Sequence, residues 1–419
     1  MVDLKKLGIY LAALIPVVAA LPAGTGSGSS PVDHYIVTMK RGMSDTEMAT
    51  HISYAKDIHS RSVSRRGLSG LVEDGVRKEF HINEHRSYSG IFDTETINAL
   101  RNHNSVASVD PVLDMHIWDT TKQLYAPWGL GSISHQISGT TNYVYEEDAQ
   151  GDGYYAYVVD TGIRASHVDF GGRAVFGFSS VANETHDDLH GHGTHVAGTI
   201  GSATFGVAKK STLVAVKVCN AVGKTNTELI MAGLAWAYAD MKNNTRIGKS
   251  VINMSLGGGR QPVLTEAVQA LYKEGVTVVV AAGNEGSDAA NYSPANAADA
   301  ITVGAVDSTY TRAAFSNYGK NVDIFAPGES IMSLGFESDT ATSVKSGTSM
   351  ASPHVAGLVL YLKELHKIEK PDEVLARLES LAVKGIVEDT NGSANVLAFN
   401  GAVDGDTQLD ISDIMRDAK

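Results

Sequence analysis

Three residues that together could perform acyl-transfer chemistry stand next to predicted strands or helices. Asp160 ends the apolar segment 154–160, His192 lies in the glycine-rich string 190–198, and Ser349 begins a long apolar segment over 349–366. A serine hydroxyl is a weak nucleophile until a neighbouring base takes its proton. An imidazole can be that base, and a carboxylate can fix its tautomer and stabilise the imidazolium. The residue types therefore predict a nucleophile, Ser349, with His192 as base and Asp160 as its partner.

A fourth residue, Asn284, follows the predicted buried strand 276–281. Its amide could donate a hydrogen bond to an oxyanion, and so could the free backbone N–H groups at the start of the Ser349 helix. Each of these signals has a structural alternative, because Asp160 could be a turn residue and Ser349 a helix cap.

A metal site is the competing interpretation of the histidines. His186, His190, His192 and His195 are close in sequence, but they lack the glutamate of a His-Glu-x-x-His motif and a third ligand at a fixed offset. A metal-dependent hydrolase built on 186–195 remains an alternative.

The elements that must position these residues have the pattern of an α/β domain. Near-continuous apolar strands between helices predict a doubly wound, mainly parallel sheet with helices on both faces. In such sheets ligands bind at the carboxyl ends of the strands, where Asp160 and Asn284 stand. The predicted strands are 154–160, 213–218, 251–256, 276–281 and 300–303, and the predicted helices are 192–201, 227–243, 264–274, 349–366 and 372–381.

Composition and the N-terminus limit the classes of protein. With 34 Lys and Arg against 47 Asp and Glu, the 419-residue chain has a net charge of −13, which argues against nucleic-acid binding. Its single cysteine excludes an intramolecular disulfide. Residues 1–20 carry Lys5 and Lys6 and then an apolar run too short to span a membrane, which predicts a signal peptide. We therefore expect a secreted, extracellular protein that is monomeric and, in its mature form, without a membrane segment.

A smaller α+β unit precedes the α/β domain. Its predicted strands are 34–40, 80–83, 88–92 and 106–111, and its predicted helices are 44–62 and 95–103. We expect four parts: a signal peptide over 1–20, a segment over 21–118 with a folded domain at about 34–112, the α/β domain over 119–402, and an acidic extension over 403–419 to which no role is assigned.

The order Asp, His, Asn, Ser and the surrounding strings resemble the subtilisin-like serine proteases, most closely the proteinase K branch with the secreted fungal alkaline (oryzin-like) proteases. The resemblance covers about 126–402, and its strings are 159–162 (VDTG), 192–195 (HGTH), 255–258 (SLGG), 281–284 (AAGN) and 347–350 (GTSM). It implies that 119–402 is a peptidase domain with a subtilisin-like fold, and that 21–118 is a propeptide with a ferredoxin-like domain. An inactive relative that only binds or inhibits is a further alternative, which the complete set of four residues disfavours.

The resemblance also implies roles for individual positions. Asp160, His192 and Ser349 would be the catalytic triad, and Asn284 with the Ser349 N–H the oxyanion hole. The segment Ser255, Leu256 and Gly257 would pair with an extended peptide substrate. Ala281, Ala282 and Gly283 would wall the pocket for the residue before the scissile bond. These small, uncharged walls predict a broad endopeptidase that prefers large apolar or aromatic residues there.

A structural calcium ion is the one cofactor that the resemblance implies. Its ligands would be the Asp323 carboxylate and the main-chain carbonyls of Ala298 and Ala300, hard oxygen donors of the kind calcium takes. Ala298 stands where this branch usually has a proline, but either residue supplies a carbonyl. No catalytic cofactor is expected.

The propeptide would act as an intramolecular inhibitor, and comparison with the branch places its cleavage between Trp118 and Asp119. Histidine changes charge between pH 5 and 8, so one hypothesis is that acidification loosens the propeptide; composition drift is the alternative. Three sequons, at Asn183, Asn243 and Asn391, could carry glycans in a secreted protein. The propeptide holds seven of the fifteen histidines: His34, His51, His59, His81, His85, His103 and His116.

Overall fold

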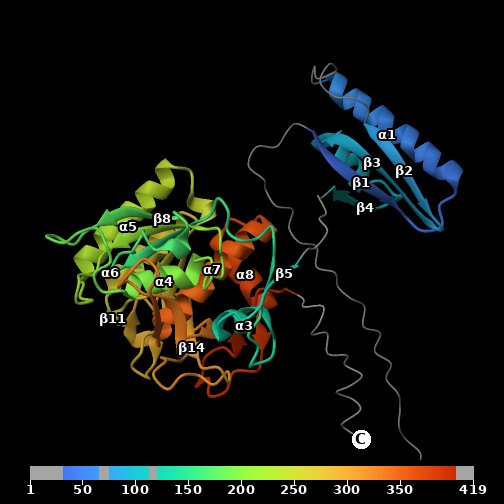
Figure 1. The fold of residues 1–419 in the computed structure, drawn as a ribbon. Coiled ribbons are helices and arrows are strands. Elements are labelled where there is room, and N and C mark those ends of the chain that lie inside the picture. The colour runs from blue at the N-terminus through green and yellow to red at the C-terminus, as the bar shows by residue number, and fades with distance from the viewer. Residues whose placement is uncertain (1–31, 66–74, 113–119, 403–419) are drawn as a thin grey trace, which may run out of the picture. The chain divides into compact units, whose positions relative to one another are not determined.

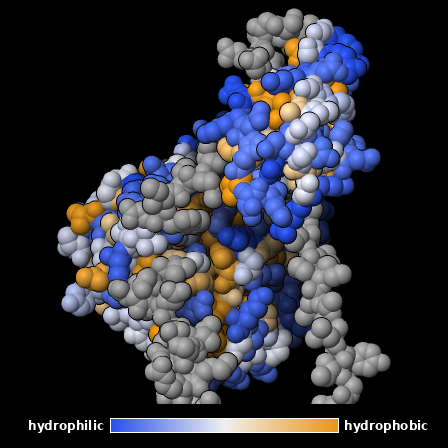
Figure 2. Space-filling view, turned by 90° about the vertical axis from the view of Figure 1, so that its right-hand side faces the viewer, coloured by the Kyte–Doolittle hydropathy of each residue, from blue (hydrophilic) through white to orange (hydrophobic). Residues whose placement is uncertain are grey.

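The computed structural model describes residues 32–65, 75–112 and 120–402, and these belong to two compact units divided after Ile117 (Figure 1). The predicted signal peptide 1–20, the extension 403–419, His116 and the predicted cleavage site at Trp118 and Asp119 lie outside the described residues. Figure 2 shows that hydrophilic residues make up most of the described surface on the face it draws, with apolar patches between them. No helix among the described residues is both long and apolar enough to cross a bilayer.

The N-terminal unit is an antiparallel four-stranded sheet with two helices. The strand order is β2-β3-β1-β4, which together with the βαββαβ chain order confirms the predicted ferredoxin-like fold. Met48 and Ile52 of α1 and Leu100 of α2 are buried in one core with Val37 and Phe92 of the sheet. The elements are β1 Val32–Met39, α1 Asp45–Arg65, β2 Val76–Ile82, β3 His85–Asp93, α2 Thr94–Arg101 and β4 Val106–Pro111.

The C-terminal unit contains, in its described part, a nine-stranded sheet in the order β18-β19-β15-β14-β12-β10-β7-β9-β8. All pairs are parallel except β18 with β19. The strands are β7 Tyr155–Asp160, β8 Ala174–Ser179, β9 Thr212–Lys217, β10 Ser250–Met254, β12 Thr277–Ala281, β14 Ile301–Val306, β15 Ile324–Pro327, β18 Val383–Lys384 and β19 Val396–Leu397.

Helices cover both faces of this sheet, as predicted. On β7, Ala156 and Val158 belong to the core that includes α4 and α7, whereas Tyr157 and Val159 belong to the core that includes α5 and α6. Since successive side chains of a strand point to opposite faces, the two helix pairs lie on opposite sides of the sheet (Figure 1). The helices are α3 Trp128–Ser134, α4 His192–Gly201, α5 Thr227–Asn243, α6 Pro262–Lys273, α7 Thr348–His366 and α8 Pro371–Leu381.

Several short strand pairs beside the main sheet were not predicted. Each has two to four residues per strand, too few to show an alternating pattern in sequence. The pairs are β5 Thr120–Gln123 with β6 Tyr143–Glu146, β11 Gly258–Gly259 with β13 Tyr292–Ser293, and β16 Ile331–Leu334 with β17 Thr342–Lys345.

Two of the propeptide-region histidines, His51 and His59, are buried in the N-terminal unit. The His51 Nε2 atom lies 3.1 Å from the Tyr88 hydroxyl, and its Nδ1 atom has no partner among the described residues. Burial, and then the charge of nearby His103, lower the pKa of His51 to about 4. Because an unfolded histidine titrates near 6.5, the unfolded state takes up this proton first as the pH falls. His51 therefore stabilises the fold above about pH 6.5, and this stabilisation is lost between about 6.5 and 4.

We predict that His51→Gln makes the N-terminal unit less sensitive to acid. The measurement is hydrogen exchange of β1 and β3 amides in the full chain carrying Ser349→Ala, with the variant compared with its parent at pH 7 and at pH 5. Protection in the parent should fall more at pH 5 than in the variant. His81→Gln, at an exposed position on β2, is the matched control. Equal losses in all three chains would reject a role for His51.

Candidate active site

Asp160 and His192 meet at the carboxyl end of β7. The His192 Nδ1 atom lies 2.8 and 2.9 Å from the two Asp160 carboxylate oxygens, and the Thr161 N–H donates to the same carboxylate at 2.7 Å. Since an ionised carboxylate only accepts hydrogen bonds, Nδ1 carries the proton and Nε2 is left to accept one. Burial lowers the pKa of His192, but the charge and hydrogen bond of Asp160 outweigh it, so the pKa is raised overall.

A second buried carboxylate, Asp188, organises the start of the helix that carries His192. It accepts hydrogen bonds from the N–H groups of His190, Gly191 and Thr194 at 2.8–2.9 Å. It also accepts from the hydroxyls of Thr194 at 2.6 Å and Thr161 at 2.8 Å. Burial alone would raise the pKa of Asp188, but these donors lower it. Sequence reasoning missed this residue, although an acidic residue shortly before a helix start is a known capping signal.

Ser349 is the second residue of α7, and its position is fixed by a network with the end of β10. Its hydroxyl donates to the Ser255 carbonyl at 3.1 Å, and the Ser255 hydroxyl donates to the Ser349 carbonyl at 2.9 Å. Asn253 extends this network, because its amide donates to Ser255 at 2.9 Å and accepts from the Ser352 hydroxyl at 2.7 Å. The described residues show no hydrogen bond between Ser349 and His192.

The helices that carry these two residues pack closely together. A Cβ atom added to Gly357 of α7 would come within 2.9 Å of the carbonyl oxygen of Ile200 on α4. Only glycine at this position lets the two helices approach so closely. His192 and Ser349 stand at the N-terminal ends of these packed helices.

Asn284 is oriented by Thr348. Its Oδ1 atom accepts from the Thr348 N–H at 2.8 Å and from the Thr348 hydroxyl at 3.0 Å. The amide Nδ2 therefore points away from Thr348, and among the described residues it has no hydrogen-bond partner, nor has the backbone N–H of Ser349. Two free donors thus stand beside the Ser349 hydroxyl.

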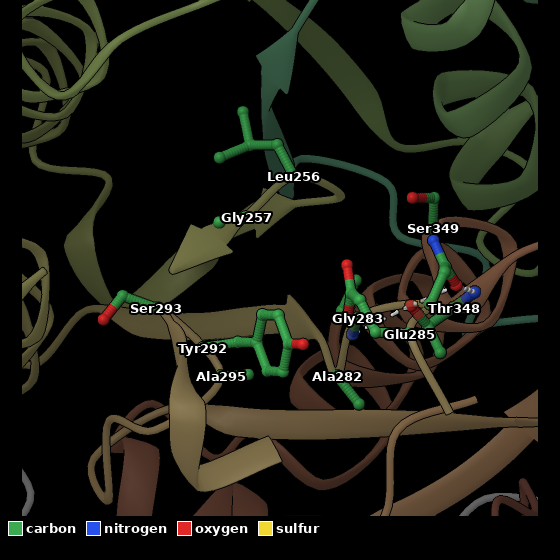
Figure 3. A pocket seen from close by; sticks show the side chains of 13 residues that line it. Leu256, Gly257, Ala282, Gly283, Glu285, Tyr292, Ser293, Ala295, Thr348 and Ser349 are labelled. Atoms are coloured by element: carbon green, nitrogen blue, oxygen red, sulfur yellow. Dashed lines mark hydrogen bonds between the residues drawn. The ribbon is translucent and has the colours of Figure 1, made fainter. Parts of the chain in front are cut away.

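One pocket brings most of the predicted substrate-binding residues together with Ser349 (Figure 3). Ser255 is not among its lining residues but bonds directly to Ser349. The prediction of uncharged walls is wrong in one respect, because the chain turns after Asn284 and Glu285 joins the lining. Its carboxylate accepts from the Asn317 amide at 2.7 Å. The lining is Leu256, Gly257, Gly258, Ala281, Ala282, Gly283, Asn284, Glu285, Tyr292, Ser293, Ala295, Thr348 and Ser349.

The histidines of segment 186–195, which are close in sequence, have different partners in the structure. His195 is buried and its Nε2 lies 3.0 Å from the Ile331 carbonyl and 3.2 Å from that of Ser343. His186 lies against the Phe176 ring, with centroids 4.0 Å apart. Within the described ranges, no group of three or more His, Cys, Asp or Glu side chains has an arrangement that could hold a metal.

The residues of the predicted calcium site lie at the starts of two neighbouring strands. Ala298 and Ala300 precede β14, and Asp323 precedes β15. The Asp323 Oδ2 atom accepts from the Thr302 N–H at 2.8 Å, and its other oxygen has no hydrogen-bond partner in the part of the chain described. Burial, partly offset by this bond, raises the pKa of Asp323 to about 6. A desolvated carboxylate with one free oxygen fits a hard cation.

Comparison with known proteins gives the class of protein. Residues 151–403 match the Subtilase family, and residues 34–116 match the Peptidase inhibitor I9 family. A solved structure of a cold-adapted subtilisin-like serine proteinase has a TM-score of 0.62 at 41% identity, covering 67% of this chain and 100% of that chain.

Individual relatives match over nearly the whole length. Alkaline protease 1 of Aspergillus clavatus is 47% identical over 406 residues, covering 96% of this chain and 100% of the relative. The alkaline proteinase of Hapsidospora chrysogena is 46% identical over 413 residues, covering 96% of this chain and 99% of the relative. The chain belongs to the subtilase family, as predicted, and is a serine protease preceded by an I9 inhibitor unit.

We predict that Asp160→Asn lowers the pKa of His192 below 6.5. The substitution removes the charge that raises this pKa and leaves the burial that lowers it. The measurement is a proton NMR titration of the imidazole in the full chain carrying Ser349→Ala, with Asp148→Asn at an exposed position as control. A His192 pKa that stays above 6.5 in the Asp160 variant would contradict the assigned electrostatics.

Proposed function

We propose that this protease is a secreted serine endopeptidase in which Asp160, His192 and Ser349 form the catalytic triad. The observation that carries the proposal is the set of groups around one hydroxyl. Ser349 stands at the N-terminus of α7, beside two donors that have no hydrogen-bond partner among the described residues. Helix α7 packs against α4, which carries His192, and His192 is hydrogen-bonded to Asp160.

In the proposed mechanism the Ser349 hydroxyl leaves the Ser255 carbonyl and turns toward His192 Nε2 as substrate binds. Oγ attacks the scissile carbonyl carbon while Nε2 takes its proton, and Asp160 stabilises the imidazolium. His192 then gives the proton to the leaving amine nitrogen, the C–N bond breaks, and an ester to Ser349 remains. A water molecule, deprotonated by His192, hydrolyses this ester and restores the hydroxyl.

Asn284 and the Ser349 N–H would hold the oxyanion of each tetrahedral intermediate. The orientation imposed by Thr348 supports this role, because it leaves Nδ2 free to donate. Loss of one such donor in a subtilisin lowers turnover by about 10²–10³, and we expect a similar loss for Asn284→Leu.

Substrate preference is proposed from the pocket beside Ser349. Its Ala and Gly residues leave room for a large apolar or aromatic side chain before the scissile bond, and the exposed backbone of Gly257 offers an edge for an extended peptide. Protein substrates and inhibition by the I9 unit agree with the family. Secretion, monomeric state, glycosylation, and self-cleavage between Trp118 and Asp119 remain predictions from the sequence.

We predict that a fluorophosphonate labels the mature enzyme at Ser349. Labelling, located by peptide mass spectrometry, should be lost in Ser349→Ala and unaffected by a zinc chelator. Ser380→Ala, which removes an exposed serine hydroxyl on α8, is the control and should leave the labelling unchanged. An active enzyme that is not labelled, or activity lost on zinc chelation, would overturn the mechanism. A protein that neither cleaves peptides nor reacts would be an inactive relative.

We also propose a structural calcium ion held by Asp323 and the carbonyls of Ala298 and Ala300. Calcium binds the ionised carboxylate, so protons should compete as the pH falls through about 6. Chelation at pH 7.5 should lower the melting temperature, less so at pH 5, and not in Asp323→Asn. Asp148→Asn should behave like the parent. A chelator effect that persists in Asp323→Asn would place the ion elsewhere.

A further inference from the structure

Asn317 is a fully buried residue that lies behind the loop carrying Asn284. It belongs to the string 315–319 (FSNYG), which the fold brings against the loop 282–287 that follows β12. The two segments are joined through their backbones, because the Asn317 N–H donates to the Gly283 carbonyl at 3.0 Å. Asn317 is not among the residues that line the pocket.

The side-chain amide of Asn317 uses all four of its hydrogen-bonding positions on this loop. Its Oδ1 atom accepts from the N–H groups of Glu285 at 3.1 Å and of Ser287 at 2.9 Å. Its Nδ2 atom donates to the Ala282 carbonyl at 3.0 Å and to the Glu285 carboxylate at 2.7 Å. An amide has two donor and two acceptor positions, so no capacity remains. Turning the amide over would place donors against donors, and its orientation is therefore fixed.

These hydrogen bonds are made on both sides of Asn284. Ala282 precedes it and Glu285 follows it, while the Asn284 side chain itself is bonded to Thr348. Thr348 therefore sets the direction in which the Asn284 amide points, and Asn317 sets where the Asn284 backbone stands. Because the asparagine side chain is short, any shift of this backbone moves the Nδ2 donor with it.

The close approach of Asn317 to the loop requires a glycine at position 283. Gly283 has a φ of +103°, and a Cβ atom added to it would come within 2.3 Å of the Asn317 Nδ2 atom. A side chain at this position would therefore displace the amide from the loop. The glycine in the pocket wall and the asparagine behind it thus form one packed unit.

We propose that Asn317 is a positioning residue for the reaction, which holds the loop 282–287 in the shape that places the Asn284 amide beside the Ser349 hydroxyl. The proposal rests on the proposed function, because it requires Asn284 to bind the oxyanion. Asn317 acts only through Asn284 and touches no reacting atom. Such an effect is large enough to measure, since a misplacement of about 1 Å caused by a distant residue can cost about 10²-fold in rate.

The first experiment is a double-mutant cycle in the mature enzyme with Asn317→Asp and Asn284→Leu. Asn317→Asp keeps the shape of the side chain but loses the Nδ2 donor, and it should lower kcat for a peptide amide about ten- to hundredfold at pH 8. Asn284→Leu removes the group through which Asn317 acts, so the second change should then lower kcat by less than about threefold. An unchanged kcat in Asn317→Asp, or equal losses in the two backgrounds, would overturn the proposal.

The cycle is measured at saturating peptide. Ala282 and Gly283 also line the pocket, so a shift of the loop raises KM as well, and only kcat reports the position of the Asn284 donor.

A pH profile of kcat in Asn317→Asp gives a signature that a merely structural role does not give. The new carboxylate would face the Glu285 carboxylate, where Nδ2 now donates at 2.7 Å. Two carboxylates this close keep one shared proton to a higher pH than a lone carboxylate does. When that proton is lost, the two charges repel each other and displace the loop. The kcat of the variant should therefore fall as the pH rises, opposite in sign to the rise caused by deprotonation of His192.

A second substitution identifies the titrating pair. Adding Glu285→Gln to Asn317→Asp supplies an amide donor in place of one acid, and the fall of kcat at high pH should disappear. Asp288 and Arg312 also face the string 315–319, through the neighbours of Asn317, and both are kept in every variant. A fall that persists in the double variant would contradict the pairing with Glu285.

Asn400→Asp is the matched control. Asn400 is also a buried amide bonded to backbone, because it donates to the Val144 carbonyl at 2.7 Å and accepts from the Ala402 N–H at 3.0 Å. Its substitution should lower the melting temperature but show no coupling to Asn284→Leu and no fall of kcat at high pH. If Asn317→Asp does not fold, Asn317→Ser, which keeps a smaller polar group, is put through the same cycle with the same two outcomes.

Failure of the proposed function looks different from failure of this proposal. If Ser349 takes up no fluorophosphonate, or if Asn284→Leu leaves kcat unchanged, the assigned site itself is wrong. If labelling occurs and Asn284→Leu lowers kcat, while Asn317→Asp acts equally in both backgrounds, only the role of Asn317 is wrong.

Discussion

The site depends on one buried carboxylate at the end of β7. Asp160 is almost completely withdrawn from water, and such a charge is stable only when its oxygens are fully hydrogen-bonded. His192 and the Thr161 N–H supply those bonds. The same requirement fixes the histidine, because Nδ1 must carry the proton and Nε2 must accept one. Burial and pairing of one acid thus determine both the orientation and the raised pKa of the base.

His192 at the start of α4 and Ser349 at the start of α7 are held in place by separate hydrogen-bond networks, and the two helices pack against each other. Asp188 and the Thr161 hydroxyl fix the start of α4 relative to β7. Ser255, bonded to Asn253, fixes the start of α7 relative to β10. Both strands are central in the sheet, where backbone pairing on either side limits movement. The sheet therefore sets the geometry of the catalytic groups, and α7 adds the Ser349 N–H, which has no hydrogen-bond partner among the described residues.

The sequence was sufficient to predict those elements that have strong local patterns. The bounds predicted for the helices 192–201 and 227–243 agree with the structure, because apolar spacing and flanking turn residues mark them. The fold and the family followed from ordered motifs. Asp188 and the β16–β17 hairpin were missed, since hydrogen bonds across the fold and four-residue strands leave no periodic signal. Glu285 was missed for a similar reason, because only the turn after Asn284 brings it to the pocket.

The predicted catalytic groups and the missed hairpin also differ in how they are held in the fold. The groups at Asp160, His192 and Ser349 stand on long elements of the core, where a shift of backbone would disturb many packed side chains. Lys345 stands on a short hairpin that contacts α4 through hydrogen bonds and through the buried side chains of Ile331 and Leu334. The Lys345 side chain itself is only half-buried, and its charge still reaches His192. In this arrangement Asp160 raises and Lys345 lowers the pKa of the same imidazole, so charges on two different elements set the protonation of the base.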